Sequence, residues 1–217
     1  MMTVVAIDGP AASGKSSVAR RLARRLGFAF VNSGSMYRAI TWEILRQGAD
    51  PKNLEGVAEA VSRAEIICGL SSTAESFIQI NGETPDHALR DEAVNRSVSL
   101  VSAVPMVRHV ISDRLRALAR ESSVVIEGRD IGSAVFPETP FKFYLDASPE
   151  IRQKRRAAEG QDDQIDARDK MDSSRVAAPL MCSPDAHVVD TSHLTLDGVV
   201  ETIFAILEAE GVPARVE

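Results

Sequence analysis

Eight residues near the start of the sequence, GPAASGKS at Gly9–Ser16, have the types and spacing of a phosphate-binding loop. They fit the pattern G-x-x-x-x-G-K-[ST], in which backbone N–H groups and the N-terminus of the next helix bind an anion. Lys15 is expected to reach the β- and γ-phosphates of a nucleoside triphosphate, and the Ser16 hydroxyl to bind Mg²⁺. The expected donor-binding residues are Gly9, Pro10, Ala11, Ala12, Ser13, Gly14, Lys15, Ser16 and Ser17.

A chance glycine-rich turn is the alternative explanation of this loop. We disfavour it because the loop follows a strand pattern and opens a helix pattern, which is the structural context that the motif requires. The loop does not identify the group that accepts the phosphate, since GTPases, ATPases, sulfotransferase-like enzymes and small kinases all carry it.

Several arginine motifs elsewhere in the sequence are suited to bind more phosphate. A small-molecule kinase brings two phosphate-bearing molecules together, so it needs many cations beyond the loop and must exclude water. The motifs are NSGSMYRA with Arg38, VPMVRHV with Arg108, EGRDIG with Glu127, Arg129 and Asp130, and RDKMDSSR with Arg168, Asp172 and Arg175.

Each of these motifs also has an ordinary structural explanation. Arg38 could lie on a helix surface, and Arg129 with Asp130 could form a local ion pair. Arg168, Asp172 and Arg175 fall on one face at helical spacing, so they could form an exposed, salt-bridged surface. We favour binding roles because the motifs occur together, behind an intact phosphate loop and at predicted strand ends.

Alternating strand and helix patterns are expected to position the motifs. The strand patterns are continuously apolar, which fits a parallel sheet covered on both faces. The binding crevice of such a sheet lies at the carboxyl ends of its strands. The predicted strands are Thr3–Asp8, Phe28–Val31, Val124–Glu127, Phe141–Asp146 and Ala186–Asp190, and the predicted helices are Lys15–Leu26, Met36–Arg46 and Leu196–Glu210 with Thr195 as N-cap.

The middle of the sequence has a different pattern. Phe77–Pro85 predicts two short strands around an Asn81-Gly82 turn, and helices follow over Asp91–Arg120 with a break at Pro105. The stretch from about Asp50 to Val104 reads as an insertion between the second and third core strands. Arg152–Arg175 is dense in charge and poor in large apolar residues, and a solvated loop is its ordinary explanation.

Composition limits the classes of function. A net charge of -6 argues against a protein that coats nucleic acid. Cys68 and Cys182 have neither metal-site spacing nor a disulfide framework, and no apolar run is long enough to span a bilayer. The N-terminus lacks the pattern of a signal peptide. We therefore expect a cytoplasmic protein with no nucleic-acid or membrane partner.

Taken together, the motifs resemble those of bacterial cytidylate kinases, in the nucleoside monophosphate kinase group of P-loop proteins. The resemblance covers nearly the whole sequence, and GRDIG…VFP with RDxxDSxRxxAPL is its most specific part. The resemblance implies an α/β fold with a five-stranded parallel sheet, a nucleotide-binding insertion and a lid. It implies a single kinase domain whose core is 1–49, 105–151 and 176–217, with a CMP-binding insertion at about 50–104 and a lid at 152–175.

The resemblance also implies the substrates and their site. ATP and Mg²⁺ would be bound at the phosphate loop, and CMP or dCMP would accept the phosphoryl group. The substrate-binding residues implied by position are Ser33, Tyr37, Arg38, Ser99, Arg108, Arg129, Asp130, Arg168, Asp172 and Arg175, and those implied in catalysis are Lys15, Arg129, Arg168 and Arg175.

Individual roles follow from the chemistry of CMP. Asp130 and Ser99 suit the cytosine amino group as acceptors, and Arg108 suits the ring acceptors as a donor. Arg38 and Arg129 suit the CMP phosphate. Asp172, helped by Arg168, suits the ribose hydroxyls, while Arg175 suits CMP or the transferred phosphoryl group.

The sequence departs from the family pattern at two places, Asn32 and the lid. Asn32 stands where Asp is common, and Glu127 keeps a carboxylate where the family has Asp or Glu, for a supporting role at Mg²⁺. Only AAEGQDDQIDA separates Arg155-Arg156 from Arg168-Asp169, about ten residues fewer than in many relatives, so the lid is short.

Two other readings remain open at the level of the sequence. One is a kinase of another small acceptor, such as UMP, AMP or a non-nucleotide acid. The other is a nucleotide switch that binds a partner protein, although the sequence has no Asn/Thr-Lys-x-Asp guanine-reading motif. We expect a monomeric CMP kinase.

Overall fold

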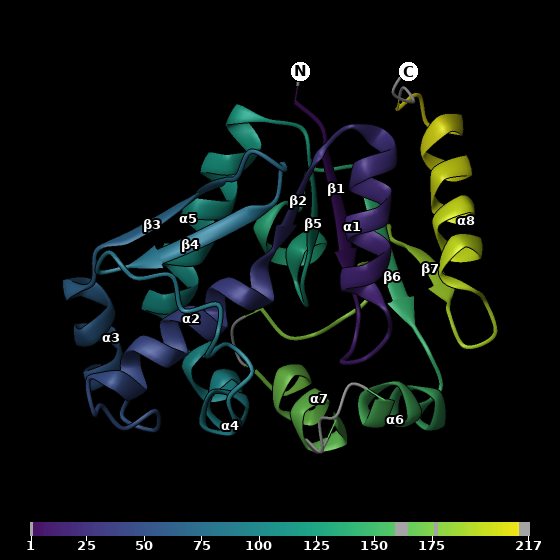
Figure 1. Cartoon of the computed structure of the whole chain (residues 1–217). Helices are drawn as coiled ribbons and strands as arrows, with labels where there is room; N and C mark the ends of the chain where they lie inside the picture. Colours follow the sequence, from purple (N-terminus) through teal and green to yellow (C-terminus); the bar gives the residue numbers. More distant parts are fainter. Residues whose placement is uncertain (1, 159–164, 176–177, 213–217) are drawn as a thin grey trace. The chain divides into compact units, whose positions relative to one another are not determined.

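The computed structural model describes residues 2–158, 165–175 and 178–212, which form both strands and helices (Figure 1). The chain forms two compact units. The core unit comprises Met1–Val31 and Ala119–Glu217, and the second unit comprises Asn32–Leu118. Each unit has its own sheet, and each is described separately below.

A five-stranded sheet forms the centre of the core unit, as predicted. Its strand order is β2-β5-β1-β6-β7, and β1 pairs in parallel with both β5 and β6, while β6 pairs in parallel with β7. Strands that run in parallel end at one edge, so Asp8, Glu127 and Asp146 all lie at strand ends. The strands are β1 Val4–Asp8, β2 Ala29–Asn32, β5 Val124–Glu127, β6 Phe141–Asp146 and β7 His187–Asp190.

The helices of the core unit follow the strands. The predicted bounds of α1 and the N-cap Thr195 of α8 are confirmed, since the Thr195 side chain accepts a hydrogen bond from Gly198 N. Arg152–Arg175, for which a loop was the ordinary explanation, contains two helices in its described part. The elements are α1 Lys15–Leu26, a π-helical turn η1 Ile131–Val135, α6 Pro149–Ala158, α7 Ile165–Ser173 and α8 Leu196–Ala209.

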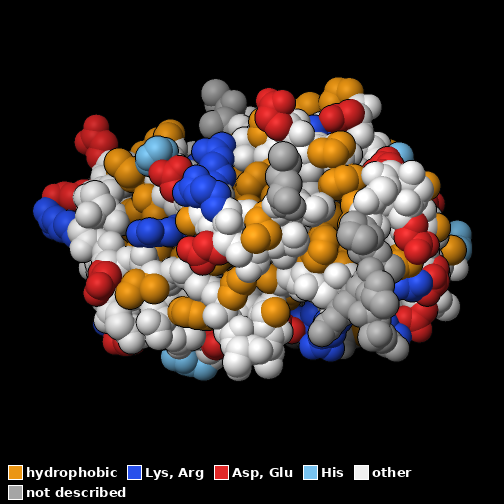
Figure 2. All heavy atoms as spheres, turned by 90° about the horizontal axis from the view of Figure 1, so that it is seen from above, with side chains coloured by type: hydrophobic (Ala, Val, Ile, Leu, Met, Phe, Trp, Pro, Cys, Tyr) orange, Lys and Arg blue, Asp and Glu red, His pale blue; other side chains and the backbone are white. Residues whose placement is uncertain are grey.

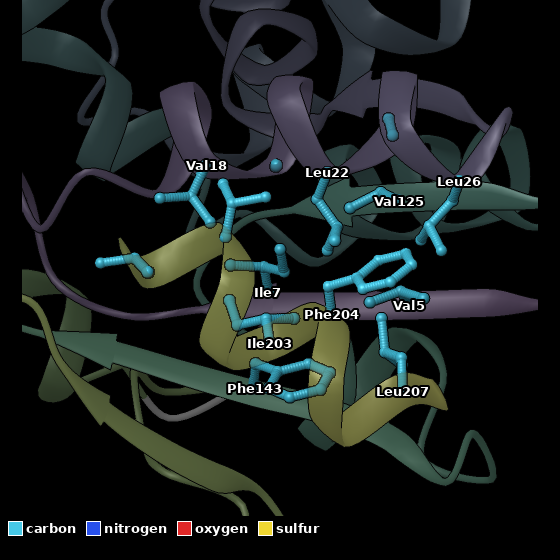
Figure 3. Packing of buried hydrophobic residues seen from close by; sticks show 14 of the residues in the cluster. Val5, Ile7, Val18, Leu22, Leu26, Val125, Phe143, Ile203, Phe204 and Leu207 are labelled. Atoms are coloured by element: carbon cyan, nitrogen blue, oxygen red, sulfur yellow. The ribbon is translucent and has the colours of Figure 1, made fainter. Parts of the chain in front are cut away.

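Apolar side chains of α1 and α8 pack on β1, β5 and β6 to form the core (Figure 3). Val18, Leu22 and Leu26 recur every four residues, so they share one face of α1. Ile203 and Leu207 do the same on α8. Burying one such side chain stabilises the fold by about 1.5–3 kcal/mol. This packing anchors α1, whose N-terminus carries the phosphate loop.

The second unit consists of helices and a two-stranded antiparallel sheet. Helix α2 contacts α3, β4 and α4. Its buried Glu43 accepts hydrogen bonds from Arg46, Gln47 and Asn81, which ties the helix to the turn after β4. The elements are α2 Ser33–Arg46, α3 Leu54–Arg63, β3 Ile66–Leu70, β4 Ser76–Ile80, α4 Glu92–Val101 and α5 Pro105–Glu121, whose last residues belong to the core unit.

Two sequence predictions for this unit differ from the structure. Residues before the Asn81-Gly82 turn do form β4, but its partner is the preceding β3, and after the turn only Glu83 forms an isolated bridge to Ile80. Helix α2 begins at Ser33 rather than Met36, because the Asn32 side chain caps it by accepting a hydrogen bond from Ser35 N at 2.9 Å. The second unit contains α2 as well as the stretch 50–104, because α2 packs with β4 and α4.

Large apolar side chains on the surface are spread along the chain, as Met2, Leu54, Ile67 and Val188 illustrate. On the face seen in Figure 2, apolar side chains alternate with charged and polar ones. Among the described residues, none of the helices combines the length and apolar character needed to cross a bilayer.

Candidate active site

The backbone of the phosphate loop requires glycine at its first position. Gly9 has φ 147°, and a Cβ built there would lie 2.0 Å from the carbonyl oxygen of Leu145 on β6. Gly14, with φ 92°, is the residue at which the loop turns into α1. The loop therefore lies directly against the sheet, and its last residues open a helix, as the sequence motif predicts.

Lys15 lies inside this loop and is only 5% exposed. Its Nζ donates hydrogen bonds to Pro10 O at 2.5 Å and to Ser13 Oγ at 3.4 Å. Burial, together with the nearby positive charge of Arg129, lowers the pKa of Lys15 from 10.5 to about 7. A buried ammonium next to a cation is stabilised by an added anion, so the site is electrostatically suited to phosphate.

Ser16 and Glu127 meet across the sheet edge. The Ser16 hydroxyl donates a hydrogen bond to Glu127 Oε1 at 2.8 Å, and Glu127 is 5% exposed at the end of β5. A hydroxyl and a carboxylate are hard oxygen ligands of the kind that Mg²⁺ prefers, with water and phosphate supplying the rest. The pair therefore fits Mg²⁺. Among the described residues there is no cluster of three or more His, Cys, Asp or Glu side chains that could hold a metal without a substrate.

Asp8 is a site residue that the sequence analysis missed. It ends β1, directly before the loop, and its carboxylate accepts hydrogen bonds from Ile131 N at 2.8 Å and Gly132 N at 2.7 Å. Burial, with a contribution from the charge of Asp130, raises the pKa of Asp8 to about 6. Asp8 thus holds the start of η1, and Asp130 directly precedes that turn. The sequence signal that could have identified Asp8 is a charged residue at the end of an otherwise apolar strand.

Asp172, whose side chain is 2% exposed, joins two other predicted charged residues of the core unit, Arg129 and Arg175. Asp172 accepts a hydrogen bond from Arg129 Nε at 3.2 Å and pairs with Arg175 through its other oxygen. Arg175 follows the end of α7 at Ser173, so the expected single helical face does not extend to it. The side chain of Arg168 lies outside the described residues.

The remaining predicted residues belong to the second unit. Ser33, Tyr37 and Arg38 are on α2, Ser99 is on α4, and Arg108 is on α5. The Arg108 guanidinium lies 5.7 Å from the centre of the Tyr37 ring, and both side chains are buried. Arg38 is more than a surface residue of α2. Its NH1 donates hydrogen bonds to Leu89 O at 2.8 Å and to Asn95 Oδ1 at 2.6 Å.

A sequence model of the family described as cytidylate kinase matches residues 5–209. The chain belongs to the cytidylate kinase family. A curated cytidylate kinase of Streptomyces griseus is 40% identical over 220 residues, covering 97% of this chain and 95% of that protein. One of Mycobacterium leprae is 41% identical over 217 residues, covering 94% and 95%. A tunicamycin resistance protein of Deinococcus radiodurans, 17% identical over the full length of both chains, has a TM-score of 0.50 and is alike in fold alone.

This cytidylate kinase family member also fastens its phosphate loop through residues that the sequence did not reveal. Thr191 Oγ1 lies 2.9 Å from Ser13 O in the loop and accepts a hydrogen bond from Arg155 NH1 at 2.9 Å. Asp169 on α7 accepts a hydrogen bond from Ala11 N, and Arg152 on α6 donates one to Ala11 O. These contacts link residues far apart in the sequence, so spacing carried no signal for them.

Proposed function

We propose that the protein transfers the γ-phosphoryl group of ATP to CMP, and also to dCMP, giving the nucleoside diphosphate and ADP. The observation that carries this proposal is the buried Lys15 beside Arg129 in an intact phosphate loop, in a chain of the cytidylate kinase family. Two cations in one buried place suit the charge that builds up on a transferred phosphoryl group.

The donor would be held by the loop N–H groups, the N-terminus of α1 and Lys15. The Ser16 hydroxyl would bind Mg²⁺, with Glu127 orienting that hydroxyl, and the ion would neutralise charge on the phosphate oxygens. Phosphate near Lys15 stabilises its charged form, so donor binding would restore an ammonium whose pKa burial has lowered to about 7.

The acceptor would be held by the residues that the family resemblance assigns to CMP. Arg38 and Arg129 suit the CMP phosphate, because a guanidinium can donate two parallel hydrogen bonds to it. Arg108, Ser99 and Asp130 suit the cytosine edge. The Asp172 carboxylate, which Arg129 and Arg175 orient, suits the ribose hydroxyls, with Arg168 beside it in the sequence motif.

The reaction needs no covalent intermediate on the protein. An oxygen of the CMP phosphate attacks the γ-phosphorus in line, the bond to the β–γ bridging oxygen breaks, and the electron pair leaves with ADP. A general base is unnecessary because the attacking phosphate is largely ionised near neutral pH. Lys15, Arg129, Arg168 and Arg175 would stabilise the charge on the transferred group.

A steady-state screen of acceptors tests this function. With ATP and Mg²⁺, we expect kcat/KM for CMP and dCMP to exceed that for UMP and AMP by at least about tenfold, because a site built to pair a substrate N–H rejects an analogue that lacks it. A reaction without acceptor measures background hydrolysis. A higher kcat/KM for UMP, AMP or a non-nucleotide acid would overturn the assignment of CMP.

The cellular setting is part of the same proposal. We place the protein in the cytoplasm as a monomer. Free thiols at Cys68 and Cys182 support a reducing compartment. Sedimentation analysis at the concentrations used for kinetics tests the monomer, and a dimer there would contradict it.

A further inference from the structure

The backbone N–H and C=O of Ala11, in the phosphate loop, are both bound by an ion pair between α6 and α7. Asp169 Oδ1 accepts a hydrogen bond from Ala11 N at 3.0 Å, and Arg152 NH1 donates to Ala11 O at 3.2 Å. The same NH1 pairs with Asp169 Oδ2. The Arg152 and Asp169 side chains are only 10% and 14% exposed, so solvent screens this contact little.

Arg152 is held in place independently of Asp169. Its Nε donates to Ala147 O at 3.2 Å, between β6 and α6. The guanidinium is therefore oriented by two backbone carbonyl groups before it meets the carboxylate. Because a fork-shaped donor of this kind fixes its acceptor in direction as well as distance, Arg152 presents Asp169 to the loop.

The Ala11 N–H belongs to the loop whose backbone donors are suited to phosphate oxygens. A carboxylate oxygen that accepts from this donor takes the role that a phosphate oxygen would have. Asp169 also acts electrostatically on Lys15, raising its pKa by its negative charge, so it lies within range of the lysine that would meet the β- and γ-phosphates. A triphosphate bound there would meet a fixed negative charge and an occupied donor.

We propose that Asp169, presented by Arg152, lowers the affinity for ATP by competing with the phosphates for the Ala11 amide. The inference deepens the proposed function, since it concerns the same donor site. Arg152 is the positioning residue, and the contact of Asp169 with Ala11 couples the position of α7 to the state of the loop.

The competition has a thermodynamic consequence. When a binding-competent form is only partly populated, the apparent Kd equals the intrinsic Kd divided by the competent fraction. Removing the carboxylate charge raises that fraction and removes repulsion of the phosphates. ATP should therefore bind more tightly to a variant without this charge, whereas loss of a purely supporting contact would weaken binding.

Calorimetric titration with Mg-ATP, in the absence of CMP, tests the sign of this effect. We expect Asp169→Asn to lower the Kd for ATP by about threefold to tenfold, the net contribution of one ordinary hydrogen bond. Glu150→Gln is the matched control, because it removes one negative charge from an exposed position on α6 without touching Ala11. In turnover, KM for ATP should fall in Asp169→Asn while KM for CMP stays unchanged. An unchanged or higher Kd overturns the inference.

A measurement on the unaltered protein gives a second test. The carboxyl ¹³C resonance of Asp169 should move when ATP saturates the protein, because the carboxylate loses the Ala11 donor; an unmoved resonance contradicts the competition. Both tests use ATP binding alone. If CMP proved not to be the acceptor, they would still apply, and if Asp169→Asn bound ATP more weakly, CMP kinase activity of the unaltered protein would be unaffected.

Discussion

The Ser16 hydroxyl donates a hydrogen bond to Glu127 Oε1 at 2.8 Å, which joins the start of α1 to the end of β5. The carboxylate orients the hydroxyl that we propose as the Mg²⁺ ligand. We expect Glu127→Gln to lower kcat by about tenfold to a hundredfold, the usual cost of losing a partner that orients a metal ligand. Raising Mg²⁺ should restore part of the loss. Kinetics that are independent of Mg²⁺ concentration in the variant would contradict the role.

Asp130 is expected to accept a hydrogen bond from the cytosine amino group. Uracil has a carbonyl at that position, which a carboxylate repels, whereas an amide can donate as well as accept. Asp130→Asn should therefore lower the ratio of kcat/KM for CMP over UMP by about tenfold or more, with little change in KM for ATP. An unchanged ratio in the acceptor screen would mean that Asp130 does not contact the base.

Asn95 is expected to orient Arg38 for the CMP phosphate. The Arg38 NH1 group is held by Asn95 Oδ1 at 2.6 Å and by Leu89 O at 2.8 Å. Asn95→Ala removes one of these acceptors, so KM for CMP should rise by about threefold to tenfold while KM for ATP stays constant. Arg96→Ala, on the exposed side of α4, is the control. Equal increases of both KM values would point to a general loss of structure.

Asp8 should make stability depend on pH. Its pKa is raised from 3.8 to about 6, chiefly by burial, so between these values the folded protein binds a proton that the unfolded chain has released. Stability contributed by this group is therefore present below pH 3.8 and falls as pH rises to 6, by about 3 kcal/mol.

Asp8→Asn removes this dependence and also loses a backbone hydrogen bond at every pH. The difference in free energy of unfolding between variant and unaltered protein should shift in favour of the variant from pH 4 to pH 7. Urea unfolding at each pH measures it, with the exposed Glu121→Gln as control. A constant difference across this range would show that Asp8 does not titrate in it.

Several features of the fold followed from short stretches of sequence. The bounds of α1, β5 and β6 agree with the apolar patterns, since strand and helix periodicities are complete within a few residues. The strand that pairs with β4 could not be predicted in this way. Its turn at Asn81-Gly82 was correctly recognised by residue type, but the strand that pairs with it, β3, precedes it, and local turn chemistry does not determine which neighbour completes a sheet.

The sequence by itself determined the phosphate loop, because Gly9 and Gly14 supply backbone angles and Lys15 and Ser16 supply chemistry within eight consecutive residues. Only the tertiary structure decided what surrounds that loop. Glu127 reaches Ser16 from 111 positions away, and Asp169 reaches Ala11 from 158 positions away. Such pairs depend on the order of strands in the sheet and on where each helix packs. A charged residue has the same local sequence signal whether it faces solvent or a distant partner.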